Sequence, residues 1–300
     1  MAMSSPLKVI FFGTPELAVP CLEVLADPKQ TPEISVVAVV TQPDKIGNRG
    51  RQAPPPVKLA AQRLGLPVLQ PHRIKANNPE GSTFIDEVRS LRPDIAIVIA
   101  YGKIVPLELL NIPQLGFLNV HVSLLPRWRG ASPIQAALLA GDSETGVTIM
   151  KMDEGMDTGP ILLQRAINID QADTAASIHD RLSSLGAAVM IEALTGYVSG
   201  ALLPVTQPAN GITSCGLIKK TNGLIDWSSD PAYIERQIRA MHPWPGAFTD
   251  IYGEPIKITE AHLESGRLVI DKVKPAGKGE MEYRAYSNGN RDRPLPPNKA

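Results

Sequence analysis

The sequence predicts an α/β protein in which a mostly parallel β-sheet, with helices on both faces, is followed by a small β-rich domain. Runs of β-branched and other apolar residues recur through the first two thirds of the chain, and segments with helical spacing separate them. Strands that are apolar on both faces are typical of parallel sheets covered by helices. After about residue 197 the pattern changes to Gly, Pro, Thr and Asn, and shorter alternating segments follow.

The first element is a buried strand over residues 8–13, which ends in a turn at Gly13. Apolar residues then recur at helical spacing from Leu17 to Leu25, so strand and helix together open a βαβ unit. The elements expected next are strand 34–41, helices 57–64 and 82–90, strands 95–100, 117–122 and 146–152, and a helix through Ile178, Leu182, Leu185 and Val189. We therefore expect a Rossmann-like domain, in which ligands bind at the carboxyl ends of the strands.

The C-terminal part is expected to be smaller and different in character. Asp230 followed by Pro231 predicts the start of a helix, and alternating segments around 249–259 and 267–273 predict a small antiparallel sheet or OB-like barrel. The expected organisation is a first domain over 1–196, a linker over 197–211, a barrel-like domain over 212–289 and a disordered tail over 290–300.

Composition excludes several classes of protein. The chain has 300 residues, and its 30 basic and 30 acidic residues cancel, so a nucleic-acid partner would need local positive charge. No apolar run reaches the roughly 18 residues of a membrane span, and the start shows no signal peptide. The lone Cys21 and Cys215 form no metal-binding or disulfide pattern. We expect a monomer in the cytoplasm, specifically the bacterial cytosol, without a bound metal or contact with a membrane.

One short stretch carries a chemical pattern. Only Val120 separates Asn119 from His121, so on a strand both side chains point to the same face, about 6 to 7 Å apart along the chain. An amide NH₂ and an imidazole N–H that converge on one carbonyl oxygen form an oxyanion hole, in which one donor lowers the barrier by roughly 2.7 to 4 kcal/mol. The pair therefore predicts acyl-transfer chemistry.

A carboxylate completes this predicted site. Asp157 can fix the imidazole tautomer and accept a proton from an attacking group. No Ser or Cys is placed to form a covalent intermediate, which favours direct attack by an amine or a water molecule. Taken singly, Asn119 and Asp157 could be turn residues and His121 a structural histidine, but the three together favour a catalytic site. The other histidines are expected to be ordinary residues: His72, His179, His242 and His262.

The segment 119–135, with 146–149 and 152–159, resembles the formyltransferase family that uses 10-formyltetrahydrofolate. The resemblance implies that Asn119, His121 and Asp157 are catalytic and that 10-formyltetrahydrofolate is the formyl donor. It also implies that a four-residue segment binds the folate: Ser123, Leu124, Leu125 and Pro126. On this basis Asn119 and His121 hold the oxyanion, while Asp157 orients His121 and helps the proton move to the folate nitrogen.

Further stretches resemble those members of the family that formylate the α-amine of initiator methionyl-tRNA: residues 12–15, 41–44, 50–52, 56–58, 225–227, 238–240 and 243–246. The resemblance implies that the C-terminal domain binds tRNA. The loop 42–56 carries three basic residues and one acidic residue, so we expect it to contact the acceptor end. The candidate tRNA contacts are Lys45, Arg49, Arg51, Lys58, Arg127 and Arg129.

Other activities remain open at this point. The same core would serve an enzyme that formylates an amino-sugar nucleotide or a purine precursor, or a formyltetrahydrofolate hydrolase in which water replaces the amine. An inactive RNA-binding homologue would not need the three polar residues together. A dinucleotide-dependent oxidoreductase is disfavoured because only Gly13, rather than GxGxxG, follows the first strand. The chain also passes quickly from His262 to Val273, as if strands were omitted, so the predicted barrel is shorter than the family's and incomplete.

Overall fold

The computed structural model describes residues 5–46 and 52–295, and its chain folds into two compact units. The first unit combines the described residues up to 129 with residues 146–166 and 180–213. The second unit contains residues 130–145, 167–179 and the described residues from 214 onward. Among the residues described, no helix has the length and apolar character required to cross a lipid bilayer.

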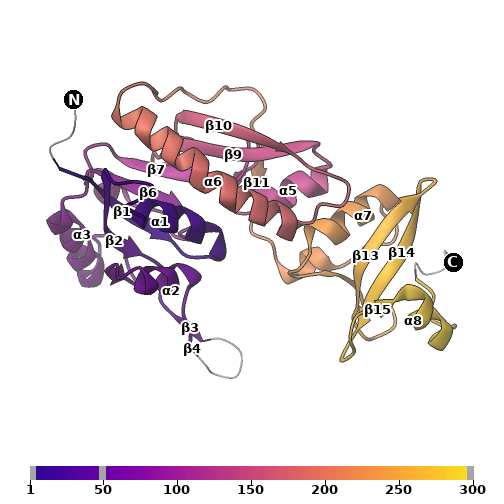
Figure 1. The fold of residues 1–300 in the computed structure, drawn as a ribbon. Helices are drawn as coiled ribbons and strands as arrows, with labels where there is room; N and C mark the ends of the chain where they lie inside the picture. The colour runs from indigo at the N-terminus through magenta and orange to yellow at the C-terminus, as the bar shows by residue number, and fades with distance from the viewer. Residues whose placement is uncertain (1–4, 47–51, 296–300) are drawn as a thin grey trace. The chain divides into compact units, whose positions relative to one another are not determined.

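The first unit is built on a seven-stranded sheet with the order β10-β9-β7-β6-β1-β2-β5 (Figure 1). Its strands are β1 (Leu7–Gly13), β2 (Ile34–Val40), β5 (Val68–Leu69), β6 (Ile95–Ile99), β7 (Phe117–His121), β9 (Glu144–Lys151) and β10 (Ile161–Asn168). Strand β1 pairs in parallel with β2 and β6, and β6 pairs in parallel with β7, whereas β9 runs antiparallel to β7. The predicted mostly parallel α/β fold is confirmed.

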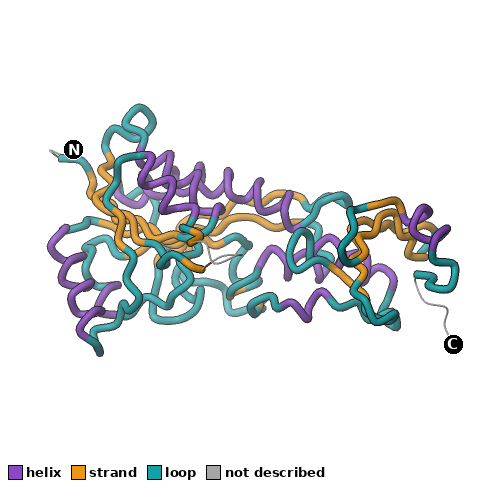
Figure 2. Tube along the Cα trace, turned by 90° about the horizontal axis from the view of Figure 1, so that it is seen from below, coloured by secondary structure: helices purple, strands orange, loops and turns teal. Residues whose placement is uncertain are grey.

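Both faces of this sheet are covered by helices. Successive side chains of β1 point to opposite faces, and apolar residues on both faces are buried. Ile10 and Phe12 pack into one core with Phe84, Ile85 and Val88 of the helix α3 (Pro79–Leu91). Figure 2 shows helices on either side of the strand layer. The other helical elements that contribute to this unit are η1 (Glu16–Ala18), α1 (Val19–Ala26), α2 (Pro56–Arg63), α4 (Leu107–Leu110) and α6 (Ala175–Val198). Two short strands, β3 (Lys45–Ile46) and β4 (Gln52–Ala53), form a separate pair.

The second unit contains an antiparallel sheet with the linear order β12-β13-β14-β15. Its strands are β12 (Ala247–Thr249), β13 (Ile256–Glu264), β14 (Arg267–Pro275) and β15 (Met281–Glu282). Ser265 and Gly266 both have positive φ angles, so β13 turns directly into β14, which explains the short passage from His262 to Val273. Within the described residues β12 does not pair with β15, so this sheet is open rather than closed into a barrel.

Helices complete the second unit: α5 (Pro133–Ala140), α7 (Pro231–Ala240) and α8 (Tyr283–Gly289). As expected, Asp230 caps α7, and its side chain accepts a hydrogen bond of 2.7 Å from the backbone N–H of Ala232. Arg236 on α7 donates from Nε to the carbonyl of Leu139 on α5. These contacts place α5, which the sequence assigns to the first domain, with the C-terminal elements.

The structure also differs from the expected linker and tail. Helix α6 continues to Val198, and in the segment after it Val205 forms a β-bridge with Ile161. In place of a disordered stretch from residue 290, the carbonyl of Pro294 accepts a hydrogen bond from Tyr252, and Leu295 is buried. Local composition does not reveal such contacts because their partners lie far away in the sequence. The remainder of that stretch, residues 296–300, lies outside the described residues.

The hairpin of β13 and β14 carries a pair that makes stability depend on pH. His262 Nδ1 lies 2.8 Å from the Asp271 carboxylate, and this hydrogen bond raises the pKa of His262. Because the pKa of His262 is higher in the folded state than in the unfolded state, the pair stabilises the hairpin fully at pH values below the unfolded pKa of about 6.5. This stabilisation is lost as the pH rises through the higher pKa of the folded state.

We expect Asp271→Asn to lower the His262 pKa in an NMR titration, and the exposed control Asp250→Asn to leave it unchanged. An unaltered His262 titration in Asp271→Asn would contradict the assignment.

Candidate catalytic site

Asn119 and His121 both lie on β7, a strand that is paired on both edges. Asn119 is opposite Val98 of β6 and Met150 of β9, and His121 is opposite Thr148 of β9. Both side chains are buried. The structure therefore places the two residues on one face of the sheet, as their spacing predicts.

The orientation of the His121 ring is fixed by a backbone carbonyl. Its Nε2 lies 2.9 Å from the carbonyl oxygen of Trp128. A carbonyl only accepts hydrogen bonds, so Nε2 carries a proton, and Nδ1 is the nitrogen that remains for chemistry. Nδ1 lies 3.7 Å from Oδ2 of Asp157, which is longer than a hydrogen bond. The structure thus brings the three predicted residues together, and gives Trp128 an orienting role that the sequence does not indicate.

The loop that presents this carbonyl is itself well anchored. Trp128 has a φ of 60°, a left-handed conformation that costs energy for a residue other than glycine. Its N–H donates a 2.8 Å hydrogen bond to the hydroxyl of Thr213, and the guanidinium of Arg127 lies 4.5 Å from the centre of its ring. These contacts hold the Trp128 backbone in the conformation that aims its carbonyl at His121.

Asp157 lies in the loop between β9 and β10, and it too has a positive φ, of 55°. Asp153 organises the same loop, because its Oδ1 accepts hydrogen bonds from the Gly155 N–H at 3.0 Å and the Thr158 hydroxyl at 2.6 Å. Gly159 passes so close to β9 that a Cβ there would lie 1.8 Å from the carbonyl oxygen of Lys151. Only glycine, which has no Cβ, therefore fits at position 159 without moving the loop.

A residue that the sequence assigns to the linker contacts this loop directly. The Nε2 of Gln207 donates to the carbonyls of Asp157 and Gly159, at 2.8 Å each. Its Oε1 accepts from Nε and Nη2 of Arg129, at 3.1 and 2.7 Å. Gln207 is only 8% exposed. No local signal in a stretch rich in Pro, Gly and Thr identifies it, because its partners are 48 to 78 residues away in sequence.

The segment predicted to bind folate follows β7 directly. Ser123 is fully buried, and its hydroxyl donates to the Arg127 carbonyl at 2.6 Å. Leu125 is also buried; its N–H donates to the Thr148 hydroxyl at 3.1 Å, and its carbonyl accepts from Gln164 at 2.9 Å. Leu124 and Pro126 are only partly buried. These two side chains are therefore the ones that a ligand could reach, while the others fix the backbone.

The candidate tRNA contacts fall into different environments. Lys45 is exposed, whereas Lys58 forms an ion pair of 2.7 Å with Asp44. Hydrogen bonds from Gln70 and then Lys58 lower the pKa of the Asp44 carboxyl. Arg129 is engaged with Gln207, while the exposed Arg127 lies over the Trp128 ring. Lys58 and Arg129 thus have structural partners within the protein, and Arg49 and Arg51 lie outside the described residues.

Comparison with known proteins identifies the chain at the level of family. Residues 7–194 match the family described as formyl transferase, and residues 217–267 match the formyl transferase C-terminal domain. The chain belongs to the formyl transferase family. It is 43% identical over 277 residues to the methionyl-tRNA formyltransferase of Geotalea daltonii, which covers 92% of this chain and 86% of the relative. It is 41% identical over 309 residues to that of Halorhodospira halophila, with 95% and 96% covered.

Solved structures show the same fold at lower identity. The methionyl-tRNA formyltransferase from Clostridium thermocellum aligns with a TM-score of 0.61 and 18% identity, over 92% of this chain and 99% of that one. An N-formyltransferase from Helicobacter canadensis, solved with folinic acid and dTDP-3-aminofucose, aligns with a TM-score of 0.65 and 22% identity, over 86% and 88%. The same fold therefore occurs in a protein named for methionyl-tRNA and in one solved with a dTDP-amino sugar, so the fold alone does not select an acceptor.

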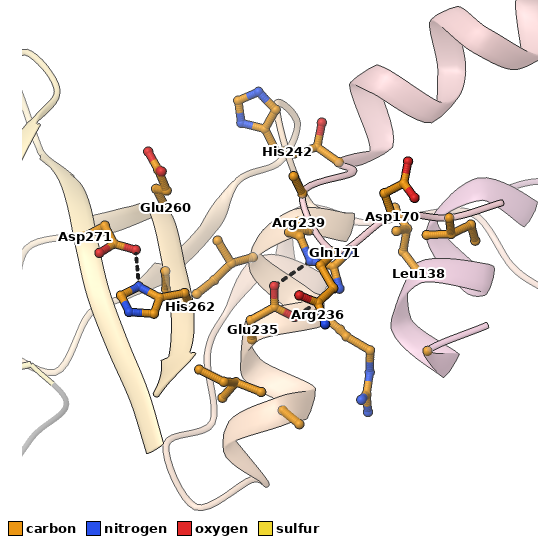
Figure 3. A pocket seen from close by; sticks show the side chains of 18 of the residues that line it. Leu138, Asp170, Gln171, Glu235, Arg236, Arg239, His242, Glu260, His262 and Asp271 are labelled. Carbon is orange, nitrogen blue, oxygen red and sulfur yellow. Dashed lines mark hydrogen bonds and ion pairs between the residues drawn. The ribbon is translucent and has the colours of Figure 1, made fainter. Parts of the chain in front are cut away.

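A cavity of about 1060 Å³ is lined by residues of the second unit, and none of the three candidate catalytic residues lines it (Figure 3). Several of the charged groups that line it are already paired. Arg239 contacts the Glu235 carboxylate and donates to the Asp173 carbonyl, and His262 contacts Asp271. We therefore do not assign chemistry to this cavity. In the part of the chain that the structure describes, no cluster of three His, Cys, Asp or Glu side chains is arranged to hold a metal ion.

The close approach of Gly159 to Lys151 yields a direct test. In Gly159→Ala the new methyl group would meet the Lys151 carbonyl, so the Asp157 loop must shift. We expect a loss of about 1 to 3 kcal/mol in the free energy of unfolding, measured by denaturant titration, and at least a tenfold loss of formyl transfer. Gly216→Ala is the control, because a Cβ at Gly216 has no neighbour within 4 Å. Unchanged stability and turnover in Gly159→Ala would contradict this steric role.

Proposed function

We propose that this formyl transferase moves the formyl group of 10-formyltetrahydrofolate to the free α-amine of initiator methionyl-tRNA, giving N-formylmethionyl-tRNA for translation initiation. The observation that carries the proposal is the approach of Asp157 to within 3.7 Å of the His121 ring, beside Asn119 on the same face of β7. The 41 to 43% identical relatives named above support the choice of acceptor. All three residues lie in one unit of one chain, so we propose that a monomer is sufficient, acting in the bacterial cytosol.

In the proposed reaction, the neutral amine nitrogen attacks the formyl carbon. A C–N bond forms, and the carbonyl electrons move to the formyl oxygen. The Asn119 amide N–H stabilises this oxyanion, and His121 contributes from Nδ1 when the ring is protonated. Because Nε2 already donates to the Trp128 carbonyl, this second donor exists only in the imidazolium state. The nearby Asp157 carboxylate balances the positive charge of that state.

The second half of the reaction needs a proton transfer. The attacking nitrogen becomes positively charged and loses a proton to the Asp157 carboxylate. The oxyanion electrons then re-form the C=O bond as the bond from the formyl carbon to the folate nitrogen breaks. That nitrogen keeps the bonding electrons and takes up the proton, so tetrahydrofolate leaves neutral at this position. The same carboxylate therefore acts first as base and then as acid. No covalent bond to the protein is required.

The folate is proposed to lie against the segment 123–126, and the tRNA against basic side chains and the second unit. Thr148 and Gln164 fix the backbone of this segment, leaving Leu124 and Pro126 accessible for apolar contact. Lys45 and Arg127 are the described candidates that are exposed, and we propose that they meet phosphates together with Arg49 and Arg51. Lys58 and Arg129 are proposed to contribute to tRNA binding only indirectly, because Lys58 is paired with Asp44 and Arg129 with Gln207.

The acceptor can be tested directly. With labelled 10-formyltetrahydrofolate, we expect the label to reach methionine-charged initiator tRNA and not a dTDP-amino sugar. A reaction without any acceptor should release formate at a negligible rate. Preferential labelling of the amino sugar would overturn the proposed acceptor, and rapid release of formate would indicate a hydrolase.

The catalytic role of Asp157 has its own test. Asp157→Asn keeps the shape of the side chain but removes the base, so we expect single-turnover rates to fall by about 10² to 10⁴ while the protein remains folded. Glu154→Gln is the matched control, because Glu154 is an exposed carboxylate of the same loop. A near-normal rate for Asp157→Asn would sink the assignment.

A further inference from the structure

The amide of Gln207 has only one orientation that satisfies its neighbours. Both Arg129 groups that contact it are donors, so the amide oxygen must face Arg129. The amide NH₂ must then face the carbonyls of Asp157 and Gly159, which only accept. Each of its two N–H bonds thus has one carbonyl acceptor, and the side chain is buried. The hydrogen-bond pattern therefore settles the position of the nitrogen without ambiguity.

The backbone that Gln207 holds is in an unfavourable conformation. Asp157 has a φ of 55°, and such a residue keeps this conformation only when its surroundings enforce it. Gly159 gives the loop its close approach to Lys151, but a glycine also widens the range of accessible conformations. A buried amide that binds the carbonyls on both sides of Thr158 restricts that range.

We propose that Gln207 is a positioning residue that holds the Asp157 carboxylate beside His121. Its other partner, Arg129, directly follows Trp128, whose carbonyl orients the His121 ring. One side chain from the segment after α6 therefore joins the loops that position Asp157 and His121. This inference rests on the proposed function, because it assigns Gln207 a role in the same reaction.

The test variant is Gln207→Glu, which keeps the length of the side chain and an acceptor for Arg129 but replaces the donor NH₂ by oxygen. We expect kcat to fall about 10- to 100-fold, since small displacements of a catalytic group have effects of this size. The KM values for both substrates should change less than threefold, because Gln207 is not proposed to touch either substrate. Gln207→Met removes the donors without adding charge, and we expect kcat to fall in this variant as well. It replaces Gln207→Glu as the test if that variant folds poorly.

Gln237 provides a matched control in the second unit. It is 6% exposed, and its Nε2 donates to the carbonyls of Asn222 and Leu224 at 2.8 and 3.0 Å, as Gln207 does to its own two carbonyls. Gln237→Glu should lower the Tm by an amount similar to Gln207→Glu while leaving kcat unchanged at saturating tRNA. Equal losses of kcat in both variants would indicate a general effect on stability and overturn the proposal.

A double-mutant cycle separates positioning from a merely structural role. If Gln207 acts through Asp157, then Gln207→Glu should change the residual rate of Asp157→Asn by less than about twofold. The same fold-loss of rate in the wild-type and Asp157→Asn backgrounds would overturn the proposal.

Hydrogen exchange of residues 152–160 in the free protein gives a readout that does not depend on the acceptor, and Gln207→Glu should accelerate this exchange. Failure of the parent protein to formylate methionyl-tRNA would count against the proposed function alone, whereas unchanged exchange would count against the role of Gln207.

Discussion

The double pairing of β7 is the constraint on which the candidate site depends. Because β6 and β9 bond to its two edges, the strand cannot rotate, and Asn119 and His121 must point to the same face. On the opposite face, Val120 lies 3.1 Å from where a Cβ of Gly186 in α6 would be, so that face is closely packed. A slip of one residue would place both polar groups against that helix. The hydrophobic core thus determines where the two proposed oxyanion donors point.

Loops bring the remaining groups to this rigid strand. Trp128 and Asp157 both have positive φ angles, and each is hydrogen-bonded to the segment after α6. The Trp128 N–H donates to the Thr213 hydroxyl, and the Asp157 carbonyl accepts from Gln207. Strained loop residues of this kind persist only when their surroundings over-determine them. A segment that joins two recognised family regions, 7–194 and 217–267, therefore contributes to the geometry of the centre.

Much of the fold could be predicted because each element carries its own local signal. Apolar runs predicted the strands β1, β2, β6 and β7, and the Asp230-Pro231 pair predicted the start of α7. The packing of residues 290–295 could not be predicted in this way. This packing depends on contacts such as the hydrogen bond from the Tyr252 hydroxyl to the Pro294 carbonyl, and no local sequence pattern connects these two distant residues.

The sequence by itself determined the strand–helix order, the shared face of Asn119 and His121, and the presence of Asp157 in a glycine-containing turn. Only the tertiary structure decided that Trp128 orients the imidazole, that Arg129 and Lys58 are held within the protein, and that Gln207 contacts the Asp157 loop. The physical reason is range. Periodicity of 2.0 or 3.6 residues is a local property of the backbone, whereas a hydrogen bond across 50 residues exists only after the chain has folded.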